Sequence, residues 1–493
     1  MKNKSFNRRD FLKMASMAGG AAFLTACAPK ATPAAEKPVE TKPEEKEPVP
    51  APTEAQVEEV QPTTAPAQQK EVTISFMGWG DTNEDEGVRT AIDEFKKEEP
   101  SITIKWMHTP DNYNEKLLAL VAANTPPDTA FVAAGDYKTF CKESLLLDIT
   151  DKVKMDPLLG KADYFIQPQE DQRCSWQGKW YGIGSCWVAN QMYYNADIFA
   201  EEGIEPPSND PEKAWTWDEF KQVATRLTKD KNGKNPSEAG FDANNIDRFG
   251  CDISSYRLNV ASFVESNGGH YFDPKTGELM LDSKEAIEAT QELADLRLKY
   301  HVAPFAANLE SLGMDSSQML ENGKLAMLVD GSWALAWLHK IKPNLGTAVL
   351  PKFQKPATGM NAHLHCVLKG TSDAETSFKL VRFLATPFYQ LLFLRMGLWL
   401  PSQTALMTPD GMKQWYTERM GSEEGVHPKG YDTLVTKYVP NNGFPFYEPP
   451  GWPDARAILY PEVDAIWNGD KTAEEAFTAI VPECIVLLQE AAK

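Results

Sequence analysis

Residues 72–106 have the sequence VTISFMGWGDTNEDEGVRTAIDEFKKEEPSITIKW. Apolar and polar residues alternate over 72–76, which predicts a half-buried strand. In the next segment acidic residues at 84–86 precede lysines at 96–97, an order that matches the dipole of a helix. Alternation returns over 102–106 and predicts a second strand. The stretch is therefore expected to form a strand, a helix and a further strand.

The same order continues along the chain. Asp111 is expected to cap a helix that runs through 117–121, and Thr216 with Glu219 has the spacing of a capping box. Two long helical patterns, at 454–467 and 471–490, close the sequence. Repeated strand–helix–strand order predicts an α/β fold with open sheets, in which ligands bind beyond the carboxyl ends of the strands.

The N-terminus has the features of an export signal. Paired arginines at 8 and 9 precede an apolar stretch over 14–24, which is too short to span a bilayer. The arginines with Phe-Leu-Lys at 11–13 resemble a twin-arginine signal, although Asn7 departs from that pattern, so the general export route stays open. Leu24-Thr25-Ala26-Cys27 resembles a lipobox, which implies a signal peptide over 1–26 and lipidation of Cys27.

Composition changes abruptly after Cys27. Residues 28–70 contain recurrent prolines among Ala, Thr, Glu and Lys, with no aromatic residue. Such a segment cannot bury enough apolar surface to offset its ordering entropy. We expect residues 27–70 to be a lipidated cysteine followed by a disordered tether, and residues 71–493 to form the folded domain.

Charge and cysteine usage restrict the partners. The chain has a formal net charge of −20, which argues against nucleic acid or an anionic membrane surface as a partner. No second apolar stretch of about 20 residues is present, so contact with the membrane is expected through the lipid anchor only. Six cysteines after Cys27 are scattered over a large domain, and their spacing does not say whether any disulfide forms.

Several segments in the middle of the chain resemble one family. Residues 178–183 (GKWYGI) precede 192–199 (MYYNADIF), 203–207 (GIEPP) and 215–220 (WTWDEF). Residues 321–334 (ENGKLAMLVDGSWA) follow, and GLWLPS stands at 397–402. In order and spacing these segments resemble extracellular solute-binding protein family 1, the maltodextrin-binding type of ABC importers.

The resemblance implies a periplasmic-binding-protein-like fold of two α/β lobes joined by three hinge crossovers. By analogy the crossovers lie near 184–187, 358–362 and 395–400. One lobe is expected over about 71–185 and 361–396, and the other over about 187–358 and 398–493. The resemblance also implies a monomeric, non-enzymatic lipoprotein on the outer face of the cytoplasmic membrane, extracellular or periplasmic, that delivers a sugar or oligosaccharide to the permease subunits of an ABC importer.

Aromatic residues indicate the class of ligand. A sugar ring stacks its C–H face on an aromatic plane, and its hydroxyls pair with planar polar groups. The chain has 13 tryptophans, several of them beside such groups where strands are expected to end. The candidate ligand-binding residues are Trp79, Asp81, Asp136, Trp187, Asn190, Trp333, Trp399, Trp452 and Arg456. Trp333, which follows Asp330-Gly331, also has the support of a family motif. The alternative role for each tryptophan is packing in the hydrophobic core.

Signals for catalysis, metals or cofactors are poor. His363 and His365 are expected on one face of a strand, near Cys366, but no fourth ligand is spaced nearby for a metal, and a crossover strand is favoured. Asp230-Lys231-Asn232-Gly233 begins like a calcium loop, yet later ligand positions fail and a simple turn is favoured. We find no P-loop, nucleophile elbow or zinc-protease motif. No cofactor, metal or catalytic residue is therefore expected.

Three alternatives stay open at this point. In the first alternative, the same fold binds a non-sugar solute. In the second, the chain is a secreted carbohydrate-active enzyme, whose paired carboxylates come together only in the folded protein. In the third, it is a surface adhesin or sensory receptor. The sequence does not identify the sugar, its chain length or its anomer.

Overall fold

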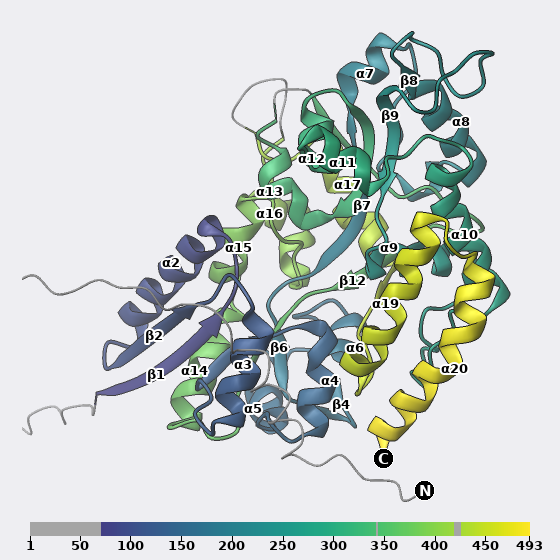
Figure 1. Ribbon diagram of the computed structural model, residues 1–493. Helices are drawn as coiled ribbons and strands as arrows, with labels where there is room; N and C mark the ends of the chain where they lie inside the picture. The colour runs from purple at the N-terminus through teal and green to yellow at the C-terminus, as the bar shows by residue number, and fades with distance from the viewer. Residues whose placement is uncertain (1–70, 342–343, 419–424) are drawn as a thin grey trace, which may run out of the picture. The chain divides into compact units, whose positions relative to one another are not determined.

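The computed structural model describes residues 71–341, 344–418 and 425–493 (Figure 1). The predicted signal peptide, Cys27 and the tether lie outside the described residues, so these stay predictions. None of the helices within the described residues combines the length and apolarity needed to cross a bilayer.

The first lobe is built on a five-stranded sheet with the order β2-β1-β3-β13-β6. Strand β1 pairs in parallel with β2 and with β3, whereas β13 runs antiparallel to both β3 and β6. Its strands are β1 (Val72–Gly78), β2 (Ile102–His108), β3 (Thr129–Val132), β6 (Gly182–Gly184) and β13 (Leu364–Val367). Its helices are α2 (Thr82–Glu98), α3 (Tyr113–Ala122), α4 (Ala134–Lys142), α5 (Thr150–Met155), α6 (Gln169–Cys174), α14 (Ala374–Leu384) and α15 (Pro387–Arg395), and a short hairpin pairs β4 (Ser175–Trp176) with β5 (Lys179–Trp180).

The second lobe is built on a sheet with the order β14-β12-β7-β10-β9-β8, in which β11 also pairs with β7. Its strands are β7 (Val188–Asn195), β8 (Lys229–Asp230), β9 (Ile246–Ile253), β10 (Leu325–Gly331), β11 (Leu345–Ala348), β12 (Thr358–Asn361) and β14 (Gly443–Pro445). The helices and helical turns of the remaining chain are α7 (Ala196–Glu201), η1 (Pro211–Lys213), α8 (Trp217–Leu227), α9 (Arg257–Ser266), α10 (Lys284–Leu298), α11 (Ala306–Leu312), α12 (Ser316–Glu321), η2 (Ser332–Ala334), α13 (Leu335–Leu338), η3 (Thr404–Met407), α16 (Pro409–Met412), α17 (Tyr431–Thr433), η4 (Leu434–Tyr438), α18 (Val439–Asn442), α19 (Trp452–Asn468) and α20 (Ala473–Ala492).

Local sequence accounts for several of these elements. The strand–helix–strand prediction over 72–106 is confirmed by β1, α2 and β2. Thr216 and Glu219 form the predicted capping box at α8. The predicted cap at Asp111 is wrong: α3 is preceded by Asn112 in a left-handed conformation, with no side-chain cap. The backbone turns into α3 at Asn112, a residue type that tolerates this conformation, so the helix begins one residue later than the cap required.

The chain passes between the two sheets where β6 leads into β7 and where β12 leads into β13. A third connection follows α15, and there Leu400 forms an antiparallel bridge with Trp187 of the first connection. The fold class predicted from the sequence, two α/β lobes joined by crossovers, is confirmed, whereas the residue boundaries of the lobes stay a prediction.

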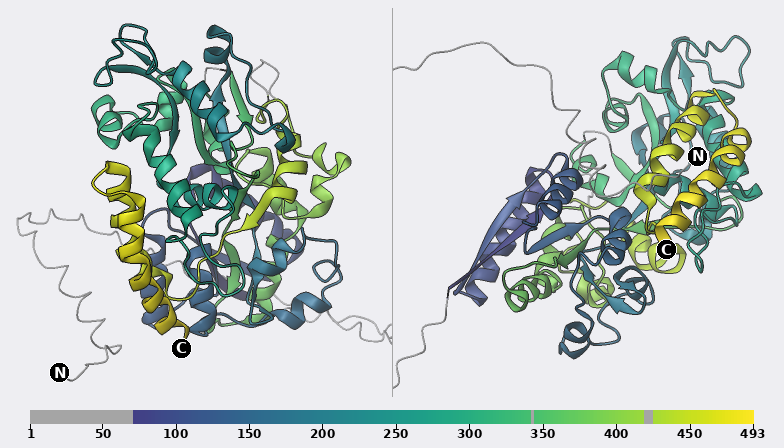
Figure 2. Two further views of the ribbon diagram at one scale, coloured as in Figure 1. Left: turned by 90° about the vertical axis from the view of Figure 1, so that its right-hand side faces the viewer. Right: turned by 60° about the horizontal axis from the view of Figure 1, so that its bottom comes forward.

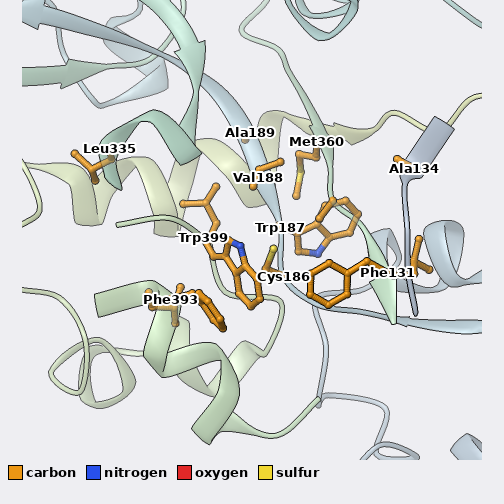
Figure 3. Packing of buried hydrophobic residues seen from close by; sticks show 14 of the residues in the cluster. Phe131, Ala134, Cys186, Trp187, Val188, Ala189, Leu335, Met360, Phe393 and Trp399 are labelled. Carbon is orange, nitrogen blue, oxygen red and sulfur yellow. The ribbon is translucent and has the colours of Figure 1, made fainter. Parts of the chain in front are cut away.

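The connections are packed rather than exposed. Trp187 and Trp399 lie close to one another with Cys186 and Phe393 around them (Figure 3), and all four are buried. The rings of Trp399 and Phe393 are stacked with centroids 4.0 Å apart. This cluster belongs to a core that continues from the first lobe to Tyr431 and Tyr438 beyond the third connection, while the rest of the second lobe has its own core.

The two C-terminal helices pack side by side, as Figure 1 and the left view of Figure 2 show. Helix α19 packs on α10 of the second lobe and also contacts α4 of the first lobe. Because the segment that precedes α19 extends the second sheet through β14, residues 443–456 bring the C-terminal part of the chain to the junction of the two lobes.

Candidate functional site

Four segments that follow strands supply polar and aromatic residues to the junction of the lobes. Residues 79–81 follow β1 and residues 133–136 follow β3 in the first lobe, and residues 254–257 follow β9 and residues 332–333 follow β10 in the second. Since β1 and β3 are parallel, as are β9 and β10, each pair of segments leaves its sheet at the same edge. This is the edge at which ligands bind in open α/β sheets.

A buried ion pair of the second lobe lies against the first lobe. The Arg257 guanidinium, at the start of α9, donates to the Glu448 carboxylate, which is fully buried. A Cβ atom added to Gly135 of α4 would lie 3.4 Å from Glu448 Oε1. The N-terminus of α4, with its positive dipole end, therefore lies close to this carboxylate.

Asp136 of the first lobe faces charges of the second lobe. Burial raises the pKa of the Asp136 carboxyl, and the nearby Glu448 carboxylate raises it further. The positive charges of Arg456 and Arg257 lower it, but the net pKa is still raised. The structure thus brings together two of the residues predicted from the sequence, Asp136 and Arg456, and adds Arg257 and Glu448. We refer to these four residues as the interlobe charge cluster.

Two further charges lie at the edge of the interlobe charge cluster. Glu115 of α3 interacts with Asp136, and Lys138, two residues further along α4, interacts with Glu448. Burial lowers the pKa of Lys138, and Glu448 partly offsets that shift. Together with the cluster these residues supply three carboxylates and three cations, so their formal charges sum to zero.

Aromatic rings of the second lobe adjoin the cluster. The Arg257 guanidinium lies 5.1 Å from the centre of the Tyr256 ring. The Tyr256 and Trp333 rings meet edge to face, with centroids 6.0 Å apart. Asp330 lies close to Tyr256, and burial raises the pKa of the Asp330 carboxyl to about 6. Trp333, which is half-buried, is therefore placed beside the charge cluster by way of Tyr256.

The segment after β1 supplies a second aromatic group. Trp79 is half-buried and packs edge-on against Tyr113, Phe131 and His363, at centroid distances of 4.8, 5.3 and 5.0 Å. Asp81 is exposed, and its Oδ1 accepts hydrogen bonds from the backbone N–H groups of Asn83 and Glu84, both at 2.9 Å. Asp81 therefore already has a structural role as the N-cap of α2.

Glu84, in the first turn of α2, is a buried carboxyl. Burial, with a smaller contribution from Asp81, raises its pKa to about 8. Its carboxyl is close enough to Cys186 and Tyr389 to influence the pKa of both, which places it beneath the first connection between the lobes. A carboxyl in this environment keeps its proton at neutral pH.

The structure buries the other four predicted site residues. Trp187 and Trp452 have 0 % of their surface exposed, and Trp399 has 4 %. The Arg173 guanidinium covers the Trp187 ring at 3.9 Å, and Trp452 packs edge-on against Phe272, with centroids 5.0 Å apart. The fourth, Asn190, donates to Asn259 Oδ1 at 2.6 Å inside the second lobe. Ligand contact by any of the nine predicted residues stays a prediction, but these four have core contacts in this structure.

Sequence analysis missed Tyr256, Arg257 and Glu448. The first two had a usable signal, because Tyr256-Arg257 stands between a strand and a helix in the same way as Asp136 and Trp333. Glu448 had none: it lies in an irregular segment, and its position depends on β14 joining the edge of the second sheet at β12.

Among the described residues no three His, Cys, Asp or Glu side chains are grouped so that they could hold a metal ion. His363 precedes β13 and His365 lies in it, with ring centroids 5.2 Å apart, and burial lowers the pKa of both, to about 3 for His365. The six cysteines of the described residues are buried free thiols. Asp230 accepts from the backbone N–H of Asn232 at 2.8 Å, which confirms the predicted turn.

The chain matches a known family over most of its length. Residues 90–417 match the family model described as bacterial extracellular solute-binding protein. Among curated relatives, a maltotriose-binding protein of Pyrococcus abyssi is 24% identical over 62% of this chain, and an arabinooligosaccharide-binding protein of Halalkalibacterium halodurans is 26% identical over 48%. The chain spans 60% and 48% of the lengths of these two relatives.

Solved structures share the fold. An ABC substrate-binding protein of Listeria monocytogenes, in complex with cycloalternan, has a TM-score of 0.71 at 20% identity, and the match covers 84% of this chain and 97% of that one. Maltose-bound MalE3 of T. maritima has a TM-score of 0.67 at 20% identity, covering 84% of this chain and 100% of that one. At these identities the likeness concerns the fold.

Proposed function

The chain belongs to the bacterial extracellular solute-binding protein family, and we propose that it binds an uncharged saccharide at the interlobe charge cluster and delivers it to an ABC importer. The observation that supports this most is the meeting of Asp136 from the first lobe with Arg257, Arg456 and Glu448 from the second, beside the Tyr256 and Trp333 rings. A ligand held there touches both lobes at once.

The chemistry of the site suits a saccharide. Carboxylates accept hydrogen bonds and guanidinium groups donate them, while each sugar hydroxyl does both. Hydrogen bonds to charged groups are worth about 1.5–3 kcal/mol each, so a few of them supply most of the affinity of a small ligand. The half-buried Trp333 ring offers an apolar face for the C–H side of a pyranose or furanose ring.

The balance of charge favours a neutral ligand. The three carboxylates at Glu115, Asp136 and Glu448 offset the three cations at Lys138, Arg257 and Arg456. Asp330 adds a carboxylate above its pKa of about 6. An anionic ligand would therefore find no uncompensated positive charge and would pay the cost of its own desolvation.

The site is proposed to bind without chemistry. Arg257 engages the Glu448 carboxylate, and Asp136 stands against Arg456 and Arg257. A glycosidase needs two carboxyl groups that flank the scissile bond, one of them a proton donor to the ligand, whereas Asp136 and Glu448 each lie against arginines. The competing proposal of a carbohydrate-active enzyme predicts new products when the protein is incubated with an oligosaccharide; we expect none.

Membrane attachment and partners complete the proposal. We propose that Cys27 carries the lipid anchor, that the tether over 28–70 holds a monomeric domain off the membrane, and that permease subunits of an importer receive the loaded protein. Membership of an extracellular family supports the outer face of the cytoplasmic membrane as the location.

A thermal-shift screen tests the proposed function. Uncharged mono- and oligosaccharides are compared with glycerol 3-phosphate, hexuronates and amino acids at equal concentration. A saccharide present at 100 times its Kd should add about 2.7 kcal/mol to the free energy of unfolding. Stabilisation by a charged or non-sugar solute alone would contradict the proposal.

A further inference from the structure

A concave site lies at the junction of the lobes, with residues of both lobes in its lining. A cavity of about 830 Å³ is lined by α4, α6 and the β4–β5 hairpin of the first lobe and, from the second, by residues 265–279, residues 444–450 and the end of α20. Its volume lies within the range of about 300–1,000 Å³ that is typical of small-molecule sites.

The cavity is separate from the interlobe charge cluster. Within residues 444–450 every residue except Glu448 lines the cavity, while Glu448 pairs with Arg257 on the other side. Residues 444–450 therefore form a wall between the two sites. Lys138 marks the boundary: it lines the cavity, interacts with Glu448, and its Nζ donates to the Tyr447 carbonyl oxygen at 3.5 Å.

The two sides of the cavity offer complementary hydrogen-bonding groups. On the first-lobe side, Lys138 and Lys142 lie one turn apart on the same face of α4, and among the described residues no carboxylate lies within ion-pair distance of either amine. On the second-lobe side, Asp273 and Glu278 supply carboxylates. A ligand that bridges them has to accept from one wall and donate to the other.

Aromatic rings stand between these polar groups. Trp176 projects from the β4–β5 hairpin and Phe272 from the opposite loop, and both are half-buried and line the cavity. Polyhydroxylated rings match this combination, because each hydroxyl donates and accepts and each ring has an apolar face. The formal charges of the lysines and acidic residues that line the cavity again sum to zero: the lysines are Lys138, Lys142 and Lys275, and the acidic residues are Glu265, Asp273 and Glu278.

We propose that this cavity is a second, separate saccharide site that holds a neutral sugar between Trp176 and Phe272. The walls of the cavity come from both lobes. A sugar bound there therefore stabilises the conformation in which both lobes contact it. By linkage it strengthens binding at the interlobe charge cluster, and the reverse also holds.

The test is the number of sugar molecules bound per chain. Calorimetric titrations with maltotriose, mannotriose and arabinotriose compare the unaltered protein with Trp176→Ala, with Lys142→Gln and with Asp136→Asn. Trp337→Ala serves as the matched control, because Trp337 is an exposed tryptophan of α13 outside the cavity. Circular dichroism and thermal melting of each variant without sugar verify the fold.

The proposal expects two molecules per chain for the unaltered protein and for Trp337→Ala. Trp176→Ala should retain one, and Lys142→Gln, which leaves the core intact, should weaken the second event at least fivefold. A single molecule per chain, bound equally by Trp176→Ala and lost in Asp136→Asn, would overturn the second site while leaving the proposed function in place. A sugar that Asp136→Asn still binds and Trp176→Ala does not would support the cavity and count against the interlobe charge cluster. Absence of binding by all three sugars would overturn the cavity proposal for this class of ligand, while the wider thermal-shift screen decides the proposed function separately.

Discussion

Replacement of Glu84 by Gln should remove a pH dependence of stability that the structure builds into the first lobe. Burial raises the pKa of the Glu84 carboxyl from 4.5 to about 8. Below pH 4.5 this carboxyl is protonated in the folded and unfolded chains alike, so it makes no difference to stability. As the pH rises from 4.5 to 8 the unfolded chain releases the proton while the folded chain keeps it, and the free energy of unfolding falls.

The magnitude follows from the shift. Each pKa unit corresponds to about 1.4 kcal/mol. The rise of the Glu84 pKa from 4.5 to about 8 therefore lowers the free energy of unfolding by on the order of 5 kcal/mol, and this loss is complete above pH 8. Glutamine has the shape of the protonated carboxyl and cannot ionise. Glu84→Gln should therefore be close to the unaltered protein in stability at pH 4.5 and more stable than it at pH 8 by most of that amount.

Urea unfolding at half-unit steps from pH 4.5 to 8.5, followed by circular dichroism, measures the difference. Glu86→Gln is the matched control, because Glu86 is exposed in the same helical turn, and its stability difference should stay flat across the range. A constant difference between the Glu84→Gln variant and the unaltered protein at all pH values would refute a buried, protonated Glu84.

Three further predictions concern the site, the anchor and the motion of the lobes. Trp333→Ala should lose roughly 1–3 kcal/mol of apolar contact with the sugar, which weakens the Kd by about fivefold to 150-fold, with little change in the melting temperature of the sugar-free protein; a sharp fall in that temperature with affinity intact would make Trp333 a core residue. Cys27→Ser should release the protein from membranes into the soluble fraction, and a variant that stays in the membrane fraction until detergent is added would place the anchor elsewhere. Small-angle scattering should show a smaller radius of gyration at saturating sugar, whereas an unchanged radius would count against closure of the lobes.

The fold was accessible from sequence because its signals are local. Alternation over 72–76, the acidic-to-basic order of the following helix and the capping box at Thr216 each depend on neighbouring residues, and each is confirmed. The order of family-like segments then gave the two-lobed architecture. Asp111 failed as a cap because the helix start was decided by the backbone conformation of the next residue, Asn112.

The site was only partly accessible. Trp333 was predicted because a family motif places it where a strand is expected to end, and Asp136 because it stands beside an aromatic residue; their contact with a ligand stays a prediction. Trp187 is buried because the Arg173 side chain, which comes from another segment of the chain, covers its ring. Likewise, the position of Glu448 depends on pairing between β12 and β14, which are distant in sequence. Such long-range packing leaves no pattern near the residue itself.

The most direct test of the central claim is a calorimetric titration of the saccharide found by the thermal-shift screen into the unaltered protein and into Asp136→Asn. Asp136 is the first-lobe member of the interlobe charge cluster, and loss of a charged hydrogen bond to a sugar hydroxyl removes about 1.5–3 kcal/mol. We expect Asp136→Asn to have a Kd for the first binding event that is weaker by about tenfold to a hundredfold, with the melting temperature of the sugar-free protein nearly unchanged. Equal affinity of the two proteins for that saccharide would contradict binding at the interlobe charge cluster.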